Sequence, residues 1–499
     1  MKTAGVFFAL FATALADTAA AHPDHAPAPP WQQATGWPDR IITTLTNDPA
    51  TSFSVTWRTD ETVGRTIAQI APATPDARFD ILAETVKPKT ERLDMEVMET
   101  EAGVRMSPFN FGLGRYAHFH SHTFEGLEPD TLYAWRVQGE RGKWSEWFQT
   151  RTAPREGPVE FVYFGDAQQG VRSHWSRVIR AASEAAPHAN FYLHAGDLVM
   201  KGDSDYNWAE WFAAGSFLHA RTPSIPVPGN HENVSVHPDD PDAALVPGGE
   251  GKRMRVRTPF WRAQFTLPVV KELPETLHEN VYDIRYTKDL HVFVVDSARS
   301  TFREQADWLE TALKASDARW KIVSMHHPYF ALQTFDRDDK DARRRRAFTP
   351  VIDGNDVDLV LTGHIHTYVR GETAEQRTSR IASGEGRSVK TVFAISASGA
   401  KSSDIYGALP VERVGDDEPD VGGVAVKRVA GNTPMFQVLR IDGDTLEYAA
   451  HMATGEVYDR FTLVKNEAGL KTLTAGEEAF GDLRLFDNTG PYREWLDLR

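Results

Sequence analysis

Five short apolar segments of this chain each stop abruptly at residues whose side chains bind metal ions. Short segments rich in β-branched and aromatic residues that end at glycine are typical of buried strands. In open α/β sheets, ligands bind beyond the carboxyl ends of the strands, so we expect the five ends to converge on one site. The ends, in chain order, are Gly165-Asp166, Gly196-Asp197, Gly229-Asn230-His231-Glu232, His326-His327 and Gly363-His364-Ile365-His366. Carboxylate, amide and imidazole groups in this number suit a pair of metal ions better than they suit an apolar core.

The composition limits what such a site can be. A length of 499 residues predicts two or three domains, and 41% hydrophobic with 25% charged residues indicates a globular chain. The net charge of −15 argues against a nucleic-acid groove, which needs a basic face. The chain has no cysteine, which excludes disulfides, thiolate ligands and a cysteine nucleophile. The remaining nitrogen and oxygen ligands suit iron, zinc or manganese.

The first residues resemble a secretory signal. Lys2 precedes an apolar stretch over 4–16, and cleavage is expected after Ala16 or Ala21. The apolar stretch is shorter than the about 20 residues that a membrane span needs. We therefore expect a periplasmic or secreted protein that makes no contact with a membrane, with residues 1–21 as signal peptide and 22–38 as a Pro/Ala-rich linker.

Two kinds of periodicity follow the linker. In residues 39–153, apolar and polar residues alternate with a period of two, which is typical of strands. Trp57 is the expected buried aromatic residue, and Tyr133 stands at the position of a tyrosine corner. In residues 156–465, predicted strands alternate with predicted helices. Helices are expected over 173–185, with Ser173 as N-cap, and over 304–315, and a hairpin is expected over 436–449. Residues 466–499 form an extension to which the sequence assigns no role.

The ordered motifs are similar to those of the calcineurin-like metallophosphoesterases and, within them, the purple acid phosphatases. A single motif of this kind is more often a turn or a buried polar group, whereas five in order favour a metal centre. The resemblance implies a multidomain fold: an N-terminal all-β sandwich of the fibronectin type III or immunoglobulin kind, then an α/β metallophosphoesterase domain built as an αββα sandwich. Residues 39–153 then correspond to the N-terminal domain of purple acid phosphatases, and 156–465 to the catalytic domain.

The resemblance also assigns roles to the motif residues. It implies two metal ions bridged by Asp197, with Asp166 and His366 on the first ion. The ligands that it implies for the second ion are Asn230, His326 and His364.

Other residues near the motifs are candidates for contact with the substrate. His231 is expected to contact the phosphate or protonate the leaving oxygen, with Glu232 orienting it. His327 is expected either to contact the substrate or to pack inside the protein, and the sequence does not choose between the two. Arg343 is a candidate for gripping a substrate phosphate, against the alternative that 343–346 is a solvated helix face.

The chain departs from the family pattern at two positions. Met200 stands where purple acid phosphatases carry a metal-binding tyrosine. Gln168 stands where the wider family often has a histidine ligand, and its amide either binds the first ion weakly or hydrogen-bonds a water. Without the tyrosinate, we expect a colourless protein whose first ion is divalent or easily exchanged.

The resemblance implies a dinuclear-metal hydrolase of phosphate esters that acts by in-line attack of a water activated between the ions. A phosphomonoesterase with a phosphorylated small-molecule substrate is favoured. A phosphodiesterase on the same centre and a non-catalytic metal- or phosphate-binding protein of the same fold stay open as alternatives, as does a homodimer. No nucleic-acid partner is expected.

Overall fold

The structure is a computed structural model that describes residues 32–100, 105–106, 114–236, 254–328, 330, 339–373, 386–405, 420–421, 423–476 and 485–487. The expected signal peptide and linker residues 22–31 lie outside these ranges, so the structure does not test them.

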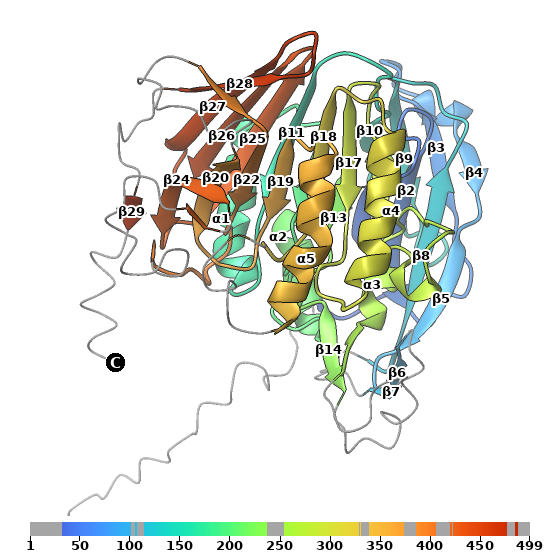
Figure 1. The fold of residues 1–499 in the computed structure, drawn as a ribbon. Coiled ribbons are helices and arrows are strands. Elements are labelled where there is room, and N and C mark those ends of the chain that lie inside the picture. Colours follow the sequence, from blue (N-terminus) through green and yellow to red (C-terminus); the bar gives the residue numbers. More distant parts are fainter. Residues whose placement is uncertain are drawn as a thin grey trace, which may run out of the picture.

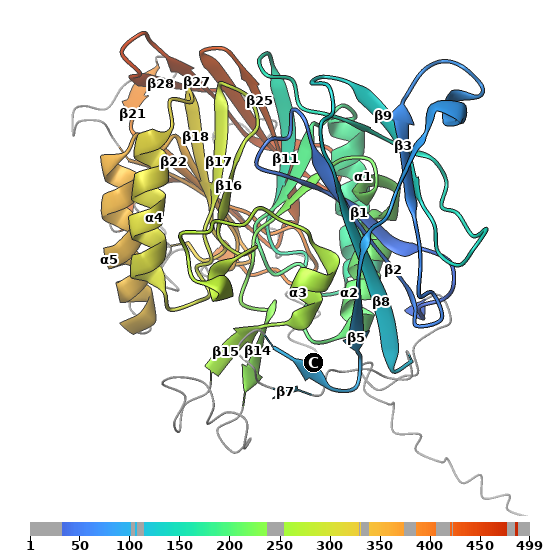
Figure 2. The ribbon, with the colours of Figure 1, turned by 90° about the vertical axis from the view of Figure 1, so that its right-hand side faces the viewer.

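Two sheets packed face to face form the centre of the molecule, with helices on both outer faces (Figures 1 and 2). Helices α1 (Ser176–Ala185) and α2 (Asp205–His219) cover the first sheet. Helices α4 (Phe302–Ala315) and α5 (Asp339–Gly354) lie side by side on the second. The expected αββα arrangement is therefore confirmed.

The first sheet has twelve strands among the described residues. In spatial order they are β21 (Arg387–Val389), β28 (Lys471–Ala475), β27 (Val457–Lys465), β26 (Thr445–Met452), β25 (Met435–Asp442), β11 (Val159–Phe164), β12 (Phe191–His194), β13 (Ser224–Pro226), β1 (Asp39–Leu45), β2 (Phe53–Asp60), β8 (Tyr116–Phe124) and β5 (Lys89–Asp94). β11, β12 and β13 run parallel, so their carboxyl ends lie at one edge.

The second sheet carries four parallel strands at its centre. Its order is β16 (Tyr282–Arg285), β17 (Leu290–Val294), β18 (Trp320–Ser324), β19 (Leu359–Thr362), β22 (Thr391–Ile395), β20 (Tyr368–Thr373), β24 (Val424–Gly431) and β23 (Asp420–Val421), with β29 (Leu485–Asp487) beside β24. The smaller elements are α3 (Pro259–Gln264), the 3-10 helices Phe79–Leu82 and Glu275–Leu277, and the ribbons β14 (Asn233–Val236) with β15 (Met254–Arg257) and β6 (Met98–Glu99) with β7 (Arg105–Met106).

Successive side chains along the strands of the second sheet pack into two different hydrophobic cores. Ile322 and Leu359 join the core that contains Phe161 of the first sheet. Val323 and Val360, one residue further along each strand, join the core beneath α4 and α5. Strands buried on both faces read as continuous apolar runs, which explains why the motif segments are apolar up to their last residue.

The N-terminal strands form a sandwich of their own. One layer consists of β1, β2, β8 and β5. It packs against a separate four-stranded sheet of β10 (Phe148–Arg151), β9 (Leu132–Val137), β3 (Ala68–Pro72) and β4 (Glu84–Val86). Trp57 is fully buried in this core, and the backbone N–H of Glu128 donates to the Tyr133 hydroxyl at 2.9 Å, as a tyrosine corner requires. β1 also pairs in parallel with β13 at Thr44 and Ser224, so the sandwich continues the first sheet.

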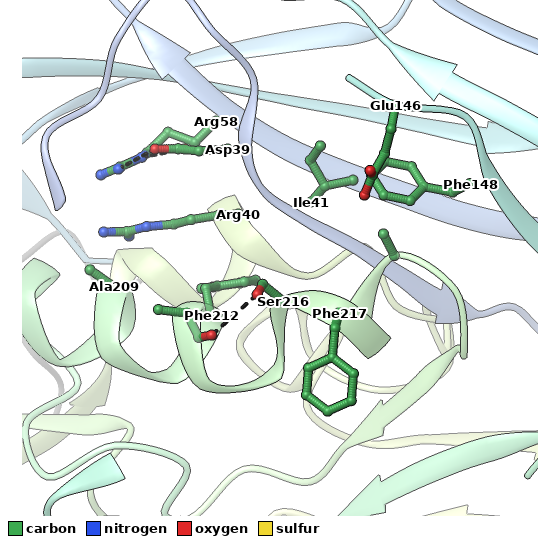
Figure 3. Close-up of a pocket in the computed structure, with 12 residues that line it drawn as sticks. Asp39, Arg40, Ile41, Arg58, Glu146, Phe148, Ala209, Phe212, Ser216 and Phe217 are labelled. Carbon is green, nitrogen blue, oxygen red and sulfur yellow. Dashed lines mark hydrogen bonds and ion pairs between the residues drawn. The ribbon is translucent and has the colours of Figure 1, made fainter. Parts of the chain in front are cut away.

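A buried ion network fastens the sandwich to α2. Asp205, fully buried at the start of α2, pairs with Arg40 at 2.6 Å and with Arg58 at 3.0 Å. Arg58 also pairs with Asp39 at 2.6 Å. Beside these groups lies a cavity of about 530 Å³ between the sandwich and α2 (Figure 3). None of its lining residues is a candidate metal ligand.

Three local expectations have different outcomes. The helix expected at 304–315 is present as α4, and the hairpin expected at 436–449 is present as β25 and β26. Ser173 as N-cap is wrong: a π-helical turn, Val171–Trp175, begins after Gly170 with left-handed φ of 59°, so Ser173 already lies inside the helical turn.

The segment beyond Lys465 is partly a sheet element. β28 lies within the expected C-terminal extension and pairs with β27 from Lys465↔Lys471 to Phe461↔Ala475. A domain boundary after Lys465 would therefore cut through the first sheet.

Candidate metal centre

The structure brings the candidate ligands together because each follows a parallel strand. Asp166 follows β11, Asp197 follows β12 and Asn230 follows β13 in the first sheet. His326 follows β18 in the second sheet, and His364 and His366 follow β19. The two packed sheets thus present their carboxyl ends to one shared site.

Asp197 lies at the centre of one donor group. Its Oδ2 is 3.1 Å from His326 Nε2, which in turn is 3.2 Å from Asn230 Oδ1. One donor atom each from Asp197, His326 and His364 lie within 4.8 Å of one another. These spacings leave room for one cation among the atoms.

Asp166 forms the second donor group beside the first. Its Oδ2 lies 3.2 Å from His366 Nε2, and its Oδ1 accepts the backbone N–H of His364 at 2.7 Å. The Gln168 backbone N–H donates to the Asp197 carbonyl at 3.0 Å, which ties the two loops together. The two donor groups are thus adjacent.

Glycines allow this close approach. A Cβ at Gly363 would lie 2.3 Å from Asp166 Oδ1, and one at Gly229 would lie 2.3 Å from Asp197 Oδ1. The backbone is also strained at the site: the left-handed residues include Gln168, Asp197, His364 and His366, with φ of 36°, 51°, 74° and 59°. Non-glycine residues persist in this region only where the surrounding structure imposes it, and such positions cluster at functional sites.

The donor atoms fit bound cations. Asp166 Oδ2, Asp197 Oδ2 and His366 Nε2 are buried without a hydrogen bond, and so are both amide atoms of Gln168. His326 Nδ1 lies 2.9 Å from the carbonyl of Ala195, which fixes the proton on Nδ1 and leaves Nε2 as a donor atom for a metal. Buried carboxylates without donors are costly unless a cation compensates them.

The pKa shifts of the site follow from its burial and its two carboxylates. Burial opposes a charge on His326, but Asp197 and Asp166 outweigh burial and raise its pKa to about 9. Burial, reinforced by His326, lowers the pKa of His364 to about 3. Burial likewise opposes ionisation of Asp197, but His326 outweighs it and holds the pKa of Asp197 below its ordinary value. The two buried carboxylates thus favour positive charge beside them.

His231 lies at the open side of the site, with 23% of its side chain exposed. Its backbone N–H donates to Asp197 Oδ1 at 2.8 Å, and its Nδ1 lies 2.5 Å from the backbone carbonyl of Met200. A carbonyl only accepts, so Nδ1 carries the proton. Nε2, 3.9 Å from Asp197 Oδ2, faces the donor groups.

Glu232 does not orient His231, contrary to the sequence-based expectation. Its buried carboxylate accepts the backbone N–H groups of Asp197, Leu198 and Gly229 at 2.8–2.9 Å and that of Val199 at 3.4 Å. It therefore holds the loop of Asp197 against the loop of Asn230. No local pattern in the sequence indicates this role of Glu232 or the contact of the Met200 carbonyl with His231.

The two candidate substrate contacts differ in placement. His327 is buried, with its ring centroid 4.1 Å from that of His364 and its Nδ1 3.1 Å from Ser297 Oγ. Arg343 is exposed on α5, as the alternative of a solvated helix face expects for this residue. Arg344 is buried, and its Nε donates to the Ser297 carbonyl at 3.1 Å.

Comparisons with known proteins agree with this architecture. Residues 38–152 match the family described as purple acid phosphatase, N-terminal domain, and residues 160–368 match the calcineurin-like phosphoesterase family. An uncharacterized protein of Mycobacterium tuberculosis is 27% identical over 351 residues, which are 64% of this chain and 60% of the relative. Purple acid phosphatase 21 of Arabidopsis thaliana is 24% identical over 250 residues, 49% of this chain and 51% of the relative.

A solved structure shares the fold. The purple acid phosphatase from yellow lupin (Lupinus luteus) seeds superposes with a TM-score of 0.65 at 16% identity, over 87% of this chain and 75% of that one. The chain spans 60% of the length of the M. tuberculosis relative and 51% of the Arabidopsis relative. The chain thus carries, in this order, a domain of the purple acid phosphatase N-terminal family and a domain of the calcineurin-like phosphoesterase family.

Proposed function

We propose that this chain is a dinuclear-metal hydrolase of phosphate esters, with phosphomonoesters as the preferred substrates. The observation that carries the proposal is the pair of adjacent donor groups, centred on Asp197 and on Asp166, in each of which the buried carboxylate Oδ2 lacks a hydrogen bond. Relatives named purple acid phosphatases support the substrate class.

The two donor groups would divide the ligands between two cations. Asp197 would contact both; Asp166, Gln168 and His366 would hold one, and Asn230, His326 and His364 the other. Bound there, the cations would supply Lewis-acid charge and lower the pKa of water. Glu232 would keep the bridging carboxylate in place through the backbone of Asp197.

His231 is the residue that we assign to the leaving group. With Nδ1–H donated to the Met200 carbonyl, Nε2 carries a proton only when the ring is cationic. Nε2 lies 3.9 Å from Oδ2 of Asp197, on the side of the donor groups. His231 would then donate from Nε2 to the leaving oxygen, or hold a phosphate oxygen, without serving as a metal ligand.

The methionine at position 200 supports the proposal that the protein is colourless. The chain offers no tyrosine at the position where purple acid phosphatases place their metal-binding phenolate, and the Met200 backbone contacts His231 instead. We propose that the first cation is held by oxygen and imidazole donors alone. A strong visible absorption band in the purified metal-loaded protein would contradict this.

We also propose export of the chain with cleavage after Ala16 or Ala21, on the strength of Lys2 and the apolar stretch that follows. In the part of the chain that the structure describes, none of the helices has both the length and the apolar character that a bilayer span requires. Mass spectrometry of the protein recovered from its native host would show the new N-terminus.

The activity is tested by hydrolysis of p-nitrophenyl phosphate and of bis(p-nitrophenyl) phosphate, with metal content measured on the same sample. We expect two metal ions per chain and faster turnover of the monoester. Faster turnover of the diester would favour a phosphodiesterase. Absence of turnover with both metals bound would favour a binding protein of the same fold.

A further inference from the structure

A basic cavity lies at the opposite edge of the sheets from the metal-binding loops. Its volume is about 250 Å³, and its lining comes from the amino ends of β18 and β22 and from the β27–β28 hairpin. In Figure 1, β27 and β28 lie at the upper edge of the molecule, whereas β14, which follows Glu232, lies at the lower edge. The cavity is therefore separate from the candidate metal centre.

Basic side chains outnumber acidic ones in its lining. The basic residues are Arg319, Lys321, Lys390, Lys465 and Lys471. The acidic residues are Asp317 and Asp356. The side chain of Asp317 is 84% exposed and pairs with Arg285, so it offsets little of the positive charge. This concentration of positive charge contrasts with the net charge of −15 of the whole chain.

Two lysines share the buried carboxylate of Asp358. Asp358 Oδ1 lies 2.7 Å from Lys465 Nζ and 2.9 Å from Lys471 Nζ. Burial lowers the pKa of Lys465 despite Asp358, and the neighbouring Lys471 and Arg319 lower it further. The two lysines thus share a single buried carboxylate, and a second anion beside them would favour the charge of both.

Two further donors are left over. Arg319 is held by its Nη2, which donates to the carbonyls of Lys465 at 2.9 Å and Asn466 at 2.7 Å and pairs with Asp444 at 2.7 Å, yet its buried Nε has no hydrogen-bond partner among the described residues. Lys390, at the amino end of β22, shows no side-chain hydrogen bond or ion pair within the described part of the chain. If the cluster served only to fasten the hairpin, the contacts of Lys465 and Lys471 with Asp358 would suffice.

We propose that this cavity binds a tetrahedral oxyanion of the phosphate class, free or at the head of a phosphomonoester. Such an anion accepts several N–H donors at once and would pair with Lys390, with the two lysines that share Asp358 and with the free Nε of Arg319. At roughly 30 Å³ per water, 250 Å³ is the space of about eight waters, enough for a phosphate with part of its hydration. Exposed Val464 and Leu470 flank Lys465 and Lys471, so a lipid headgroup is one source of the same chemistry.

The site is tested by calorimetric titration of inorganic phosphate into the full chain at low salt, before and after chelation of its metals. Chelation removes phosphate binding at the metal centre, and circular dichroism checks that the fold is kept. We expect the chelated protein to retain one phosphate site. This outcome does not depend on the hydrolase activity that we propose.

Variants at Lys390 locate the retained site. Lys390→Gln is expected to weaken it roughly fivefold, the size of one partly exposed charge contact, and Lys390→Glu to abolish it. Lys271→Gln, at an exposed lysine outside the cavity, serves as the matched control and should bind like the parent protein.

Sedimentation with phosphatidylcholine vesicles, with and without phosphatidic acid, separates the two sources of the anion. Binding of the vesicles alone, lost in Lys390→Glu, would support the site and assign it to a lipid headgroup. Absence of both kinds of binding in the chelated protein, or binding that Lys390→Glu leaves unchanged, would overturn the proposal.

Discussion

Replacing Gln168 by methionine should move two measurable quantities in opposite directions. The Gln168 side chain is 2% exposed, and both polar atoms of its amide lack a hydrogen-bond partner. Burying an amide without a partner costs about 1–3 kcal/mol, and methionine keeps an unbranched side chain of similar length without that cost. We therefore expect Gln168→Met to raise the free energy of unfolding of the metal-free protein by about 1–3 kcal/mol.

The same substitution should weaken metal binding. In the loaded protein, the amide oxygen of Gln168 would have a cation as partner, so its removal costs affinity at the donor group of Asp166. We expect at least about a tenfold loss, the lower end for removing a group that supports a metal site. Stability is measured by urea unfolding of chelated protein, and affinity by metal content at a buffered free zinc concentration.

Gln437→Met is the matched control. Gln437 in β25 is fully buried, and both of its amide atoms also lack partners, but it is not a candidate ligand. It should gain a similar amount of stability and keep its metals. If Gln168→Met destabilises the metal-free protein, the amide has partners there after all. If it retains both metals at parent affinity, Gln168 is no ligand.

Three further substitutions test other parts of the account. His231→Gln should lower turnover of p-nitrophenyl phosphate about 10²-fold or more with metal content unchanged, and loss of a metal would instead make His231 a ligand. Asp205→Asn leaves the buried Arg40 without its ion partner, so the free energy of unfolding in urea should fall by about 3–5 kcal/mol; a loss under about 1 kcal/mol would contradict this. Burial, with His118, lowers the pKa of His120 from 6.5 to about 3, so the stability due to its neutral form is complete above pH 6.5 and is lost as the pH falls. At pH 5 the loss is about 2 kcal/mol, from 1.5 pH units at about 1.4 kcal/mol each, and an unchanged pH dependence of unfolding in His120→Gln would refute it.

The sequence could predict the parts of the site that follow from local pattern. Apolar runs ending at Asp166, Asp197 and His326 specify strands and their carboxyl ends, and the topology of parallel sheets then brings those ends together. The tyrosine corner at Tyr133 and the helix α4 rest on equally local signals and are present.

Contacts between residues far apart in the chain were beyond local pattern. Glu232 accepts four backbone N–H groups because two loops meet around it. Its position next to His231 in the sequence therefore led to the wrong partner. Which arginine of 343–346 is buried depends on the rotation of α5, and a run of four arginines does not specify that rotation. The pairing of β1 with β13 and of β28 with β27 joins segments that periodicity describes only singly.

The most direct test of the account is an anomalous difference map from crystals of the zinc-loaded protein. We predict two peaks about 3.5–4 Å apart, as in other two-metal sites, with Asp197 between them, Asp166 and His366 on one side, and Asn230, His326 and His364 on the other. A site that stays empty at saturating zinc, or a single peak that Asp197 does not touch, would contradict the account.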